Sequence, residues 1–180
     1  MYGIYDRGYT PTSYNEQSKS IQVSNNVCRL DIVEIEGQDP LEPRRWDEKR
    51  ERDAYVLVYD TTSRRSFQTI RLLSDLTKHS QDAVIMLVGT KIDRNDRREV
   101  QQAEGMVLAQ ELGGSFSEVS ALKKLGIDEM IKYLALLLLE RKSNAKTQRS
   151  YFELETPQTS IWNNVCRVLL QCLGREGGPT

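Results

Sequence analysis

Two short strings in the sequence carry groups that could recognise a purine base. Asp93 closes the string Val88–Asp93, which follows an apolar run, and Ser120–Leu122 follows a second extended run. A carboxylate accepts two adjacent N–H donors, and guanine presents such a pair, N1–H and its 2-amino group, whereas adenine does not. A buried carboxylate left unpaired makes the wrong base costly, by about 1–3 kcal/mol. The first string alone is more typical of a solvated loop, so the second is needed to favour a guanine site.

The neighbours of these groups complete the predicted base site. Lys91 can lay its methylene stem along the face of a base and send its ammonium to a ribose or a loop carbonyl. The backbone N–H of Ala121 can meet the 6-oxo group of guanine, and Leu122 can pack on the ring. Both strings must then lie at the same edge of the fold.

The surrounding elements predict such an edge. Continuous apolar runs are typical of strands buried on both faces, and apolar residues at helical spacing separate them. Alternation of this kind predicts an α/β fold, a three-layer, mostly parallel sheet with helices on both faces. Ligands bind at the carboxyl ends of such strands, where both strings lie. The predicted elements are a hairpin over 21–35 about Asn25–Asn26, strands at 54–60, 83–88 and 115–119, and helices at 63–78, 100–112 and 127–142.

The remaining segments are predicted to lack regular structure. Residues 1–20 fit a loop, and the highly charged stretch 39–53 fits an exposed, weakly ordered helix or loop. Residues 143–159 are polar and predict a linker. In the tail, 160–180, the apolar residues fit one short amphipathic helix.

Composition excludes several classes of function. The net charge of -1 gives no field that would attract nucleic acid or an anionic membrane, and charges of both signs are mixed over 42–53. Three cysteines, Cys28, Cys166 and Cys172, form no disulfide framework and favour a reducing, cytoplasmic compartment. The only histidine, His79, fits a surface position. No apolar run reaches membrane-spanning length, and the polar N-terminus is unlike a secretory signal.

The two strings, in this order, resemble the base-recognition loops of the Ras superfamily of small GTPases. Thr90, where most members have asparagine, is similar to the Rho branch. The resemblance extends over roughly 5–142 and implies a P-loop GTPase-like domain at 1–142 that is incomplete at its N-terminus. It also implies GTP or GDP and Mg²⁺ as ligands.

The resemblance also covers the switch segments. Tyr9–Thr12 looks like the first switch, which implies that Tyr9 and Thr12 contact the nucleotide and that the Thr12 hydroxyl binds Mg²⁺. Residues 30–38 look like the strand and second switch. Gly37 would then donate its N–H to the γ-phosphate, and Gln38 would orient the attacking water.

Two departures from the family pattern predict that GTP hydrolysis is impaired or absent. Glu34 stands where the family has an aspartate that holds a Mg²⁺ water, and Glu36 adds a carboxylate near the γ-phosphate. The phosphate-binding loop G-x-x-x-x-G-K-[ST] is not in the sequence. Relative to the family, the chain is expected to begin within the helix after that loop. It would then lack the central strand between 27–35 and 54–60, leaving two unpaired ladders.

Two functions remain open at this stage. The chain is either a guanine-nucleotide-binding switch in signal transduction or a nucleotide-independent pseudo-GTPase that acts as an interaction module. In both cases effector and regulator proteins are expected at about 9–17 and 37–50. Cys166 and Cys172 could carry palmitate on an amphipathic helix, giving peripheral membrane association. Prenylation is not supported, because the chain continues to Thr180 beyond Cys172.

Overall fold

The computed structural model describes residues 14–23, 26–36, 52–77, 83–150 and 165–172. They form a six-stranded sheet in the order β1-β2-β6-β3-β4-β5. β1 pairs with β2 antiparallel, and all other pairs are parallel. The predicted mostly parallel α/β sheet is confirmed. The strands are β1 Tyr14–Val23, β2 Asn26–Glu36, β3 Ala54–Asp60, β4 Val84–Thr90, β5 Ser115–Glu118 and β6 Val165–Cys172.

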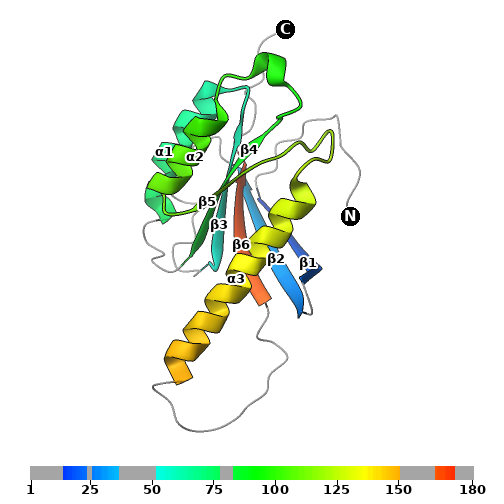
Figure 1. The fold of residues 1–180 in the computed structure, drawn as a ribbon, viewed down its shortest axis with the longest axis vertical. Helices are drawn as coiled ribbons and strands as arrows, with labels where there is room; N and C mark the ends of the chain where they lie inside the picture. Colours follow the sequence, from blue (N-terminus) through cyan, green and yellow to red (C-terminus); the bar gives the residue numbers. More distant parts are fainter. Residues whose placement is uncertain (1–13, 24–25, 37–51, 78–82, 151–164, 173–180) are drawn as a thin grey trace.

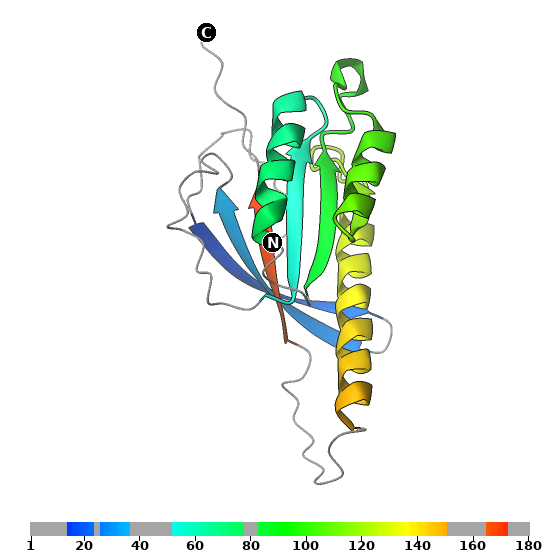
Figure 2. The ribbon, with the colours of Figure 1, turned by 90° about the vertical axis from the view of Figure 1, so that its left-hand side faces the viewer.

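Helices cover both faces of the sheet, as predicted. α3 (Ile127–Ser150) lies along one face, and α1 (Arg64–Thr77) and α2 (Gln102–Glu111) lie side by side on the other, as Figures 1 and 2 show. Successive side chains of β3 point to opposite faces of the sheet, so β3 contacts the helices of both layers. Val56 packs in the cluster that contains α3, whereas Leu57 packs in the cluster of α1 and α2. β3 is therefore buried on both faces.

The N-terminal hairpin is confirmed, but it is longer than predicted. β1 begins at Tyr14, within the segment expected to be a loop, and pairs with β2 from Tyr14↔Ile35 to Val23↔Asn26. Its outer half is polar, and Ser18 donates a hydrogen bond of 2.6 Å to Asp31 across the pair. A polar edge strand shows no alternation of apolar and polar residues, so the sequence did not predict a strand before residue 21.

A glycine allows α2 to approach the sheet closely. A Cβ placed on Gly105 would lie 2.4 Å from Cε2 of Phe116 and 2.6 Å from the hydroxyl of Tyr59. α2 then ends as predicted at a glycine, Gly113, which has a left-handed φ of 66°. The close approach encloses the Tyr59 ring completely, since its relative exposure is 0%.

The hydroxyl of Tyr59 has no hydrogen-bond partner among the described residues. Burial, followed by the nearby charge of Glu118, raises the pKa of this phenol, so the group stays neutral. We expect Tyr59→Phe to leave the free energy of unfolding unchanged or to raise it by about 1 kcal/mol, because the variant removes an unpaired polar group. Urea unfolding measures this. A loss above about 1 kcal/mol would mean that the hydroxyl has a partner in solution.

The structure corrects three predictions for the C-terminal part. α3 continues to Ser150, through the first half of the predicted linker, and the predicted amphipathic helix in the tail is instead the strand β6. This strand pairs with both β2 and β3, so the two ladders expected to be unpaired are paired. Cys166 and Cys172 belong to this strand and not to the amphipathic helix that could have carried palmitate. Within the described residues, no helix has the length and apolar character needed to cross a bilayer.

Candidate base-recognition site

The two predicted loops meet at one end of the sheet. Asp93 follows β4 and Ser120 follows β5, and the Ser120 hydroxyl donates a hydrogen bond to Oδ1 of Asp93. Ser120 is fully buried, whereas Asp93 is half-buried. The parallel pairing of β4 with β5 brings the loops together, because it places both carboxyl ends at the same edge.

Two polar groups at this edge have no partner within the described part of the chain. Asp93 uses Oδ1 for Ser120, and its Oδ2 accepts no hydrogen bond there. The backbone N–H of Ala121 likewise donates none, while its carbonyl accepts from Lys124 at 3.4 Å. Leu122 is 45% exposed beside them. A carboxylate oxygen, an amide N–H and an apolar side chain are therefore available together.

Backbone hydrogen bonds hold each loop in shape. Lys91 adopts a left-handed φ of 64°, and its carbonyl accepts from Arg94 at 2.9 Å to close a tight turn. In the second loop, Ser120 and Leu125 exchange two backbone hydrogen bonds of 3.0 Å. The N–H of Lys123 also donates to the Ser120 hydroxyl at 3.0 Å. The serine thus links its own loop to the aspartate of the other.

Lys91 has a different partner from the predicted ribose or loop carbonyl. Its ammonium donates to the carboxylate of Asp60, at the end of β3, whose side chain is 6% exposed. Thr62 adds two more hydrogen bonds to Asp60, at 2.9 Å from its N–H and 2.7 Å from its hydroxyl. Burial would raise the pKa of this carboxyl, but the hydrogen bonds from Lys91 and Thr62 outweigh it and hold the pKa below its usual value.

The lowered pKa of Asp60 makes a specific contribution to acid sensitivity. Its stabilisation is present above the pKa of about 4 that the group has in the unfolded chain, and it is lost as pH falls through the lower folded value. We expect the difference in unfolding free energy between wild type and Asp60→Asn to be constant from pH 7 to 5 and to shrink below about pH 4. Urea titrations at each pH measure it. A difference that stays constant to about pH 2 would contradict this assignment.

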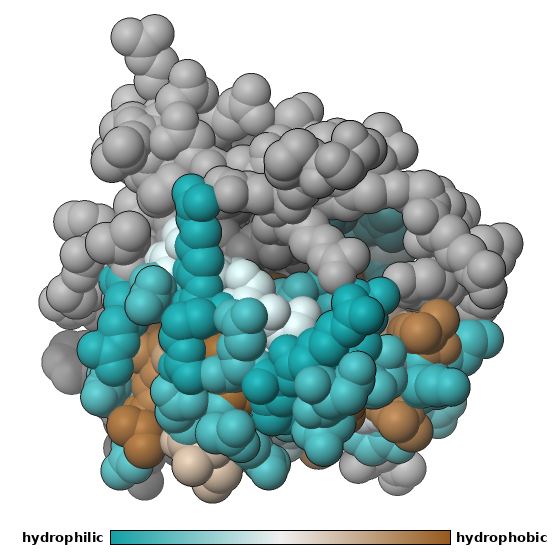
Figure 3. All heavy atoms as spheres, turned by 90° about the horizontal axis from the view of Figure 1, so that it is seen from above, coloured by the Kyte–Doolittle hydropathy of each residue, from teal (hydrophilic) through white to brown (hydrophobic). Residues whose placement is uncertain are grey.

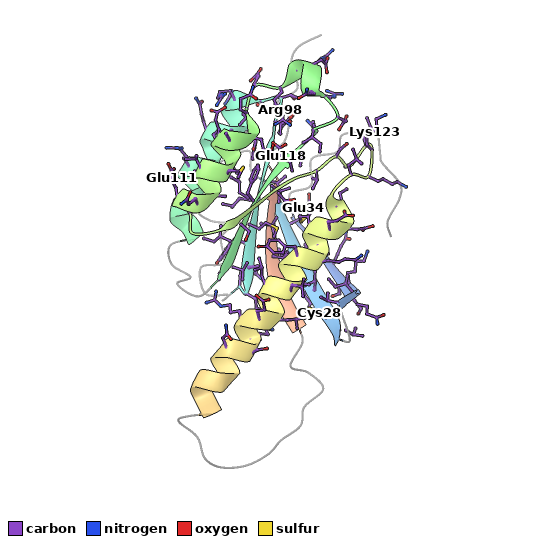
Figure 4. The ribbon with its side chains drawn as sticks, viewed as in Figure 1. Cys28, Glu34, Arg98, Glu111, Glu118 and Lys123 are labelled. Carbon is purple, nitrogen blue, oxygen red and sulfur yellow. The ribbon has the colours of Figure 1, made fainter. Side chains whose placement is uncertain are left out.

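A partly buried ion pair that the sequence did not reveal lies beside the same two loops. Arg98, after the 3₁₀ turn η2 (Asn95–Arg97), donates to both carboxylate oxygens of Glu118 at 2.7 and 3.0 Å (Figure 4). The two side chains are only 13% and 11% exposed. The bond to Glu118 raises the pKa of Arg98 above its usual value. This pair ties the segment after Asp93 to the strand before Ser120.

The other predicted site residues are only partly within the described chain. Thr90 donates its hydroxyl to the carbonyl of Tyr59 at 2.9 Å, so it joins the ends of β4 and β3. Glu34 lies near the carboxyl end of β2, opposite Asn15 of β1 (Figure 4). The described part of the chain contains no cluster of three or more His, Cys, Asp or Glu residues that could hold a metal ion. Outside the described residues lie Tyr9, Thr12, Gly37 and Gln38.

The surface around the two loops is mostly hydrophilic. Figure 3 looks down on the upper end of Figure 1, and most of the described residues on this face are polar or charged. A separate pocket, lined by residues that include Ala83, Gly114 and Leu137, lies at the opposite, amino-terminal ends of β4 and β5. The candidate site is therefore the loop edge and not that pocket.

Comparison with known proteins identifies the family. The family model described as "Ras family" matches residues 1–140. Ras-like protein rasW of Dictyostelium discoideum is 35% identical over 144 residues, covering 78% of this chain and 66% of the relative. Ras-like protein rasB of that organism is 36% identical over 124 residues, covering 67% and 63%. GTP-binding protein Rit2 of Rattus norvegicus is 30% identical over 138 residues, covering 75% and 64%. The chain thus spans about two-thirds of the length of each, and it belongs to the Ras family.

Proposed function

We propose that this chain is a guanine-recognising domain of a small GTPase switch in signal transduction, with GTP hydrolysis impaired or absent. One observation carries the proposal: the hydrogen bond from Ser120 to Oδ1 of Asp93 joins two loops that each keep an unused polar group. Guanine offers two donors on one edge and an acceptor at its 6-oxo group. Oδ2 of Asp93 and the N–H of Ala121 match that pattern.

The apolar part of the site supports a flat ring as the ligand. Leu122 is exposed beside Ala121, and the methylene stem of Lys91 runs toward Asp60 while its ammonium is held there. A lysine fixed by a buried carboxylate has fewer conformations to lose when a base packs on its stem. We therefore keep Lys91 and Leu122 as the residues that contact the faces of the base.

Impaired hydrolysis is supported by the sequence of the chain. It contains no G-x-x-x-x-G-K-[ST] motif, whose N–H groups and lysine bind the α- and β-phosphates. Glu34 and Glu36 place carboxylates where phosphate and Mg²⁺ chemistry needs a shorter acid and a neutral residue. We expect no measurable GTP turnover by the purified chain and little gain in affinity from phosphates.

A binding experiment tests the base assignment. Guanosine, GTP, adenosine and xanthosine are titrated against the wild-type chain and Asp93→Asn. We expect guanosine to bind better than adenosine and about as tightly as GTP. Asp93→Asn should weaken guanosine by about 10²-fold, because the amide offers a donor to a donor edge. The same variant should improve xanthosine, whose 2-oxo group accepts from an amide.

The same loop supplies a matched control. Asp96 is an aspartate of the segment after β4 whose side chain is 77% exposed, so Asp96→Asn should change no affinity. Equal binding of adenosine and guanosine would refute the base assignment. GTP binding at micromolar affinity, with guanosine much weaker, would refute the predicted lack of phosphate contacts.

The second candidate is a nucleotide-independent interaction module. It is favoured by the pairing of β6 with both β2 and β3, which fills the centre of the sheet with a segment of the chain itself. Absence of binding by any nucleoside to a folded chain would select it. In either case we propose that effector or regulator proteins bind at about 9–17 and 37–50, which includes the exposed Glu16 and Gln17 of the edge strand β1.

A further inference from the structure

The last strand of the described structure lies in the middle of the sheet. β6 stands between β2 and β3 and runs parallel to both, as the red-orange strand in Figures 1 and 2 shows. It pairs with β2 from Arg29↔Val165 to Glu36↔Cys172, and with β3 from Ala54↔Val168 to Val58↔Cys172. β6 therefore comes after all the other described strands in the sequence but lies between two of them in the sheet.

β6 is also the only described strand that connects the two halves of the sheet. β2 pairs with β1 on its other side, and β3 pairs with β4, so no described ladder joins β2 to β3 directly. Without β6, each of these strands presents an unpaired edge. Two parallel edges that face each other form a slot that accepts one further parallel strand.

Helix α3 packs against the strands on both sides of this slot. Leu138 and its neighbours on α3 share one buried cluster with Cys28 and Leu30 of β2 and with Val56 of β3. The two half-sheets are thus bound to a common helix.

The chain beyond α3 is long enough to carry β6 to another molecule. Residues 151–164 separate the end of α3 from the start of β6, and at full extension such a segment reaches about 46–50 Å. β6 has 8 residues and is about 26 Å long. β6 is the last element of the described structure.

We propose that the slot between β2 and β3 accepts β6 from a second copy of this chain, and that two copies exchange their strands reciprocally. The bonds made in the slot are the same whichever copy supplies the strand. Covalent linkage gives the strand of the same chain an effective concentration near the millimolar range, so exchange is favoured at high protein concentration and on refolding. This inference does not depend on nucleotide binding.

Refolding of mixed isotopic copies tests the exchange. Full-length chains with natural isotopes and with ¹⁵N, each carrying a protease site within residues 153–158, are refolded together at high concentration and analysed by native mass spectrometry. We expect dimers of mixed mass. Cutting the site should convert them into particles of monomer size, because only the crossing segments hold the two bodies together. Monomers at every concentration, or dimers that survive cutting, would overturn the proposal.

A peptide experiment tests the slot itself. The full-length chain is cut at the inserted site, and a labelled peptide with the sequence of residues 161–176 is added in excess. The labelled peptide should replace the native fragment. A matched peptide with Val168→Pro should bind at least about 10-fold more weakly, since proline removes an N–H from a central strand. No uptake of the first peptide, or equal uptake of both, would contradict a slot that exchanges its strand.

Discussion

Arg98→Ala is expected to lower the free energy of unfolding by about 2–3 kcal/mol, because it leaves the partly buried carboxylate of Glu118 without its partner. Glu118 is 11% exposed, and within the described residues both hydrogen bonds to its carboxylate come from Arg98. The arginine also donates to the carbonyl of Val100 at 3.1 Å, so its loss frees a third acceptor. Urea unfolding followed by circular dichroism measures the change.

A neighbouring arginine supplies the control for this prediction. Arg97 is 70% exposed and lies 3.7 Å from Asp96, so Arg97→Ala should change stability by about 0.5 kcal/mol or less. The double variant Arg98→Met, Glu118→Leu should be more stable than either single variant, because apolar residues of similar volume need no partner. If Arg98→Ala costs no more than Arg97→Ala, the pair is not buried in solution.

The Arg98–Glu118 pair illustrates which parts of the site the sequence could not predict. The two residues are separated by the whole of α2, and neither belongs to a periodic pattern. Their contact depends on how α2 returns the chain to the edge of β5. In contrast, Asp93 and Ser120 were predictable, because each directly follows a strand and the carboxyl ends of parallel strands lie at the same edge.

The same distinction applies to the fold. β3 was predicted with the correct bounds, because Ala54–Asp60 is a continuous apolar run that ends in polar residues. β6 was not, since a short apolar run such as Val165–Cys172 is compatible with helix or strand, and the open place in the sheet decides between them. The final turns of α3 are polar and show no apolar period, so the sequence predicted a linker there. Non-local pairing, which one sequence does not display, accounts for the error at β6.

The interface between α3 and the sheet gives the second large prediction. Leu138→Ala is expected to lower the free energy of unfolding by about 2–5 kcal/mol, the range for truncating a buried leucine. Leu138 is 1% exposed and packs in the cluster that joins β2 and β3 through α3. Thermal and urea unfolding measure the loss. Because α3 holds both sides of the slot for β6, the same variant should also release the β6 fragment more readily after the chain is cut.

Leu136 makes the comparison specific to the buried face of α3. It lies two residues away on the same helix and is 39% exposed, so Leu136→Ala removes the same atoms from a site that faces solvent in part. Its cost should be about 0.5 kcal/mol or less, helped by the slightly higher helix propensity of alanine. Equal losses for the two variants would mean that α3 does not pack on the sheet through Leu138. If Leu138→Ala lowers stability strongly but does not speed the release of β6, the strand is retained by its hydrogen bonds to β2 and β3 alone. Those hydrogen bonds do not involve α3.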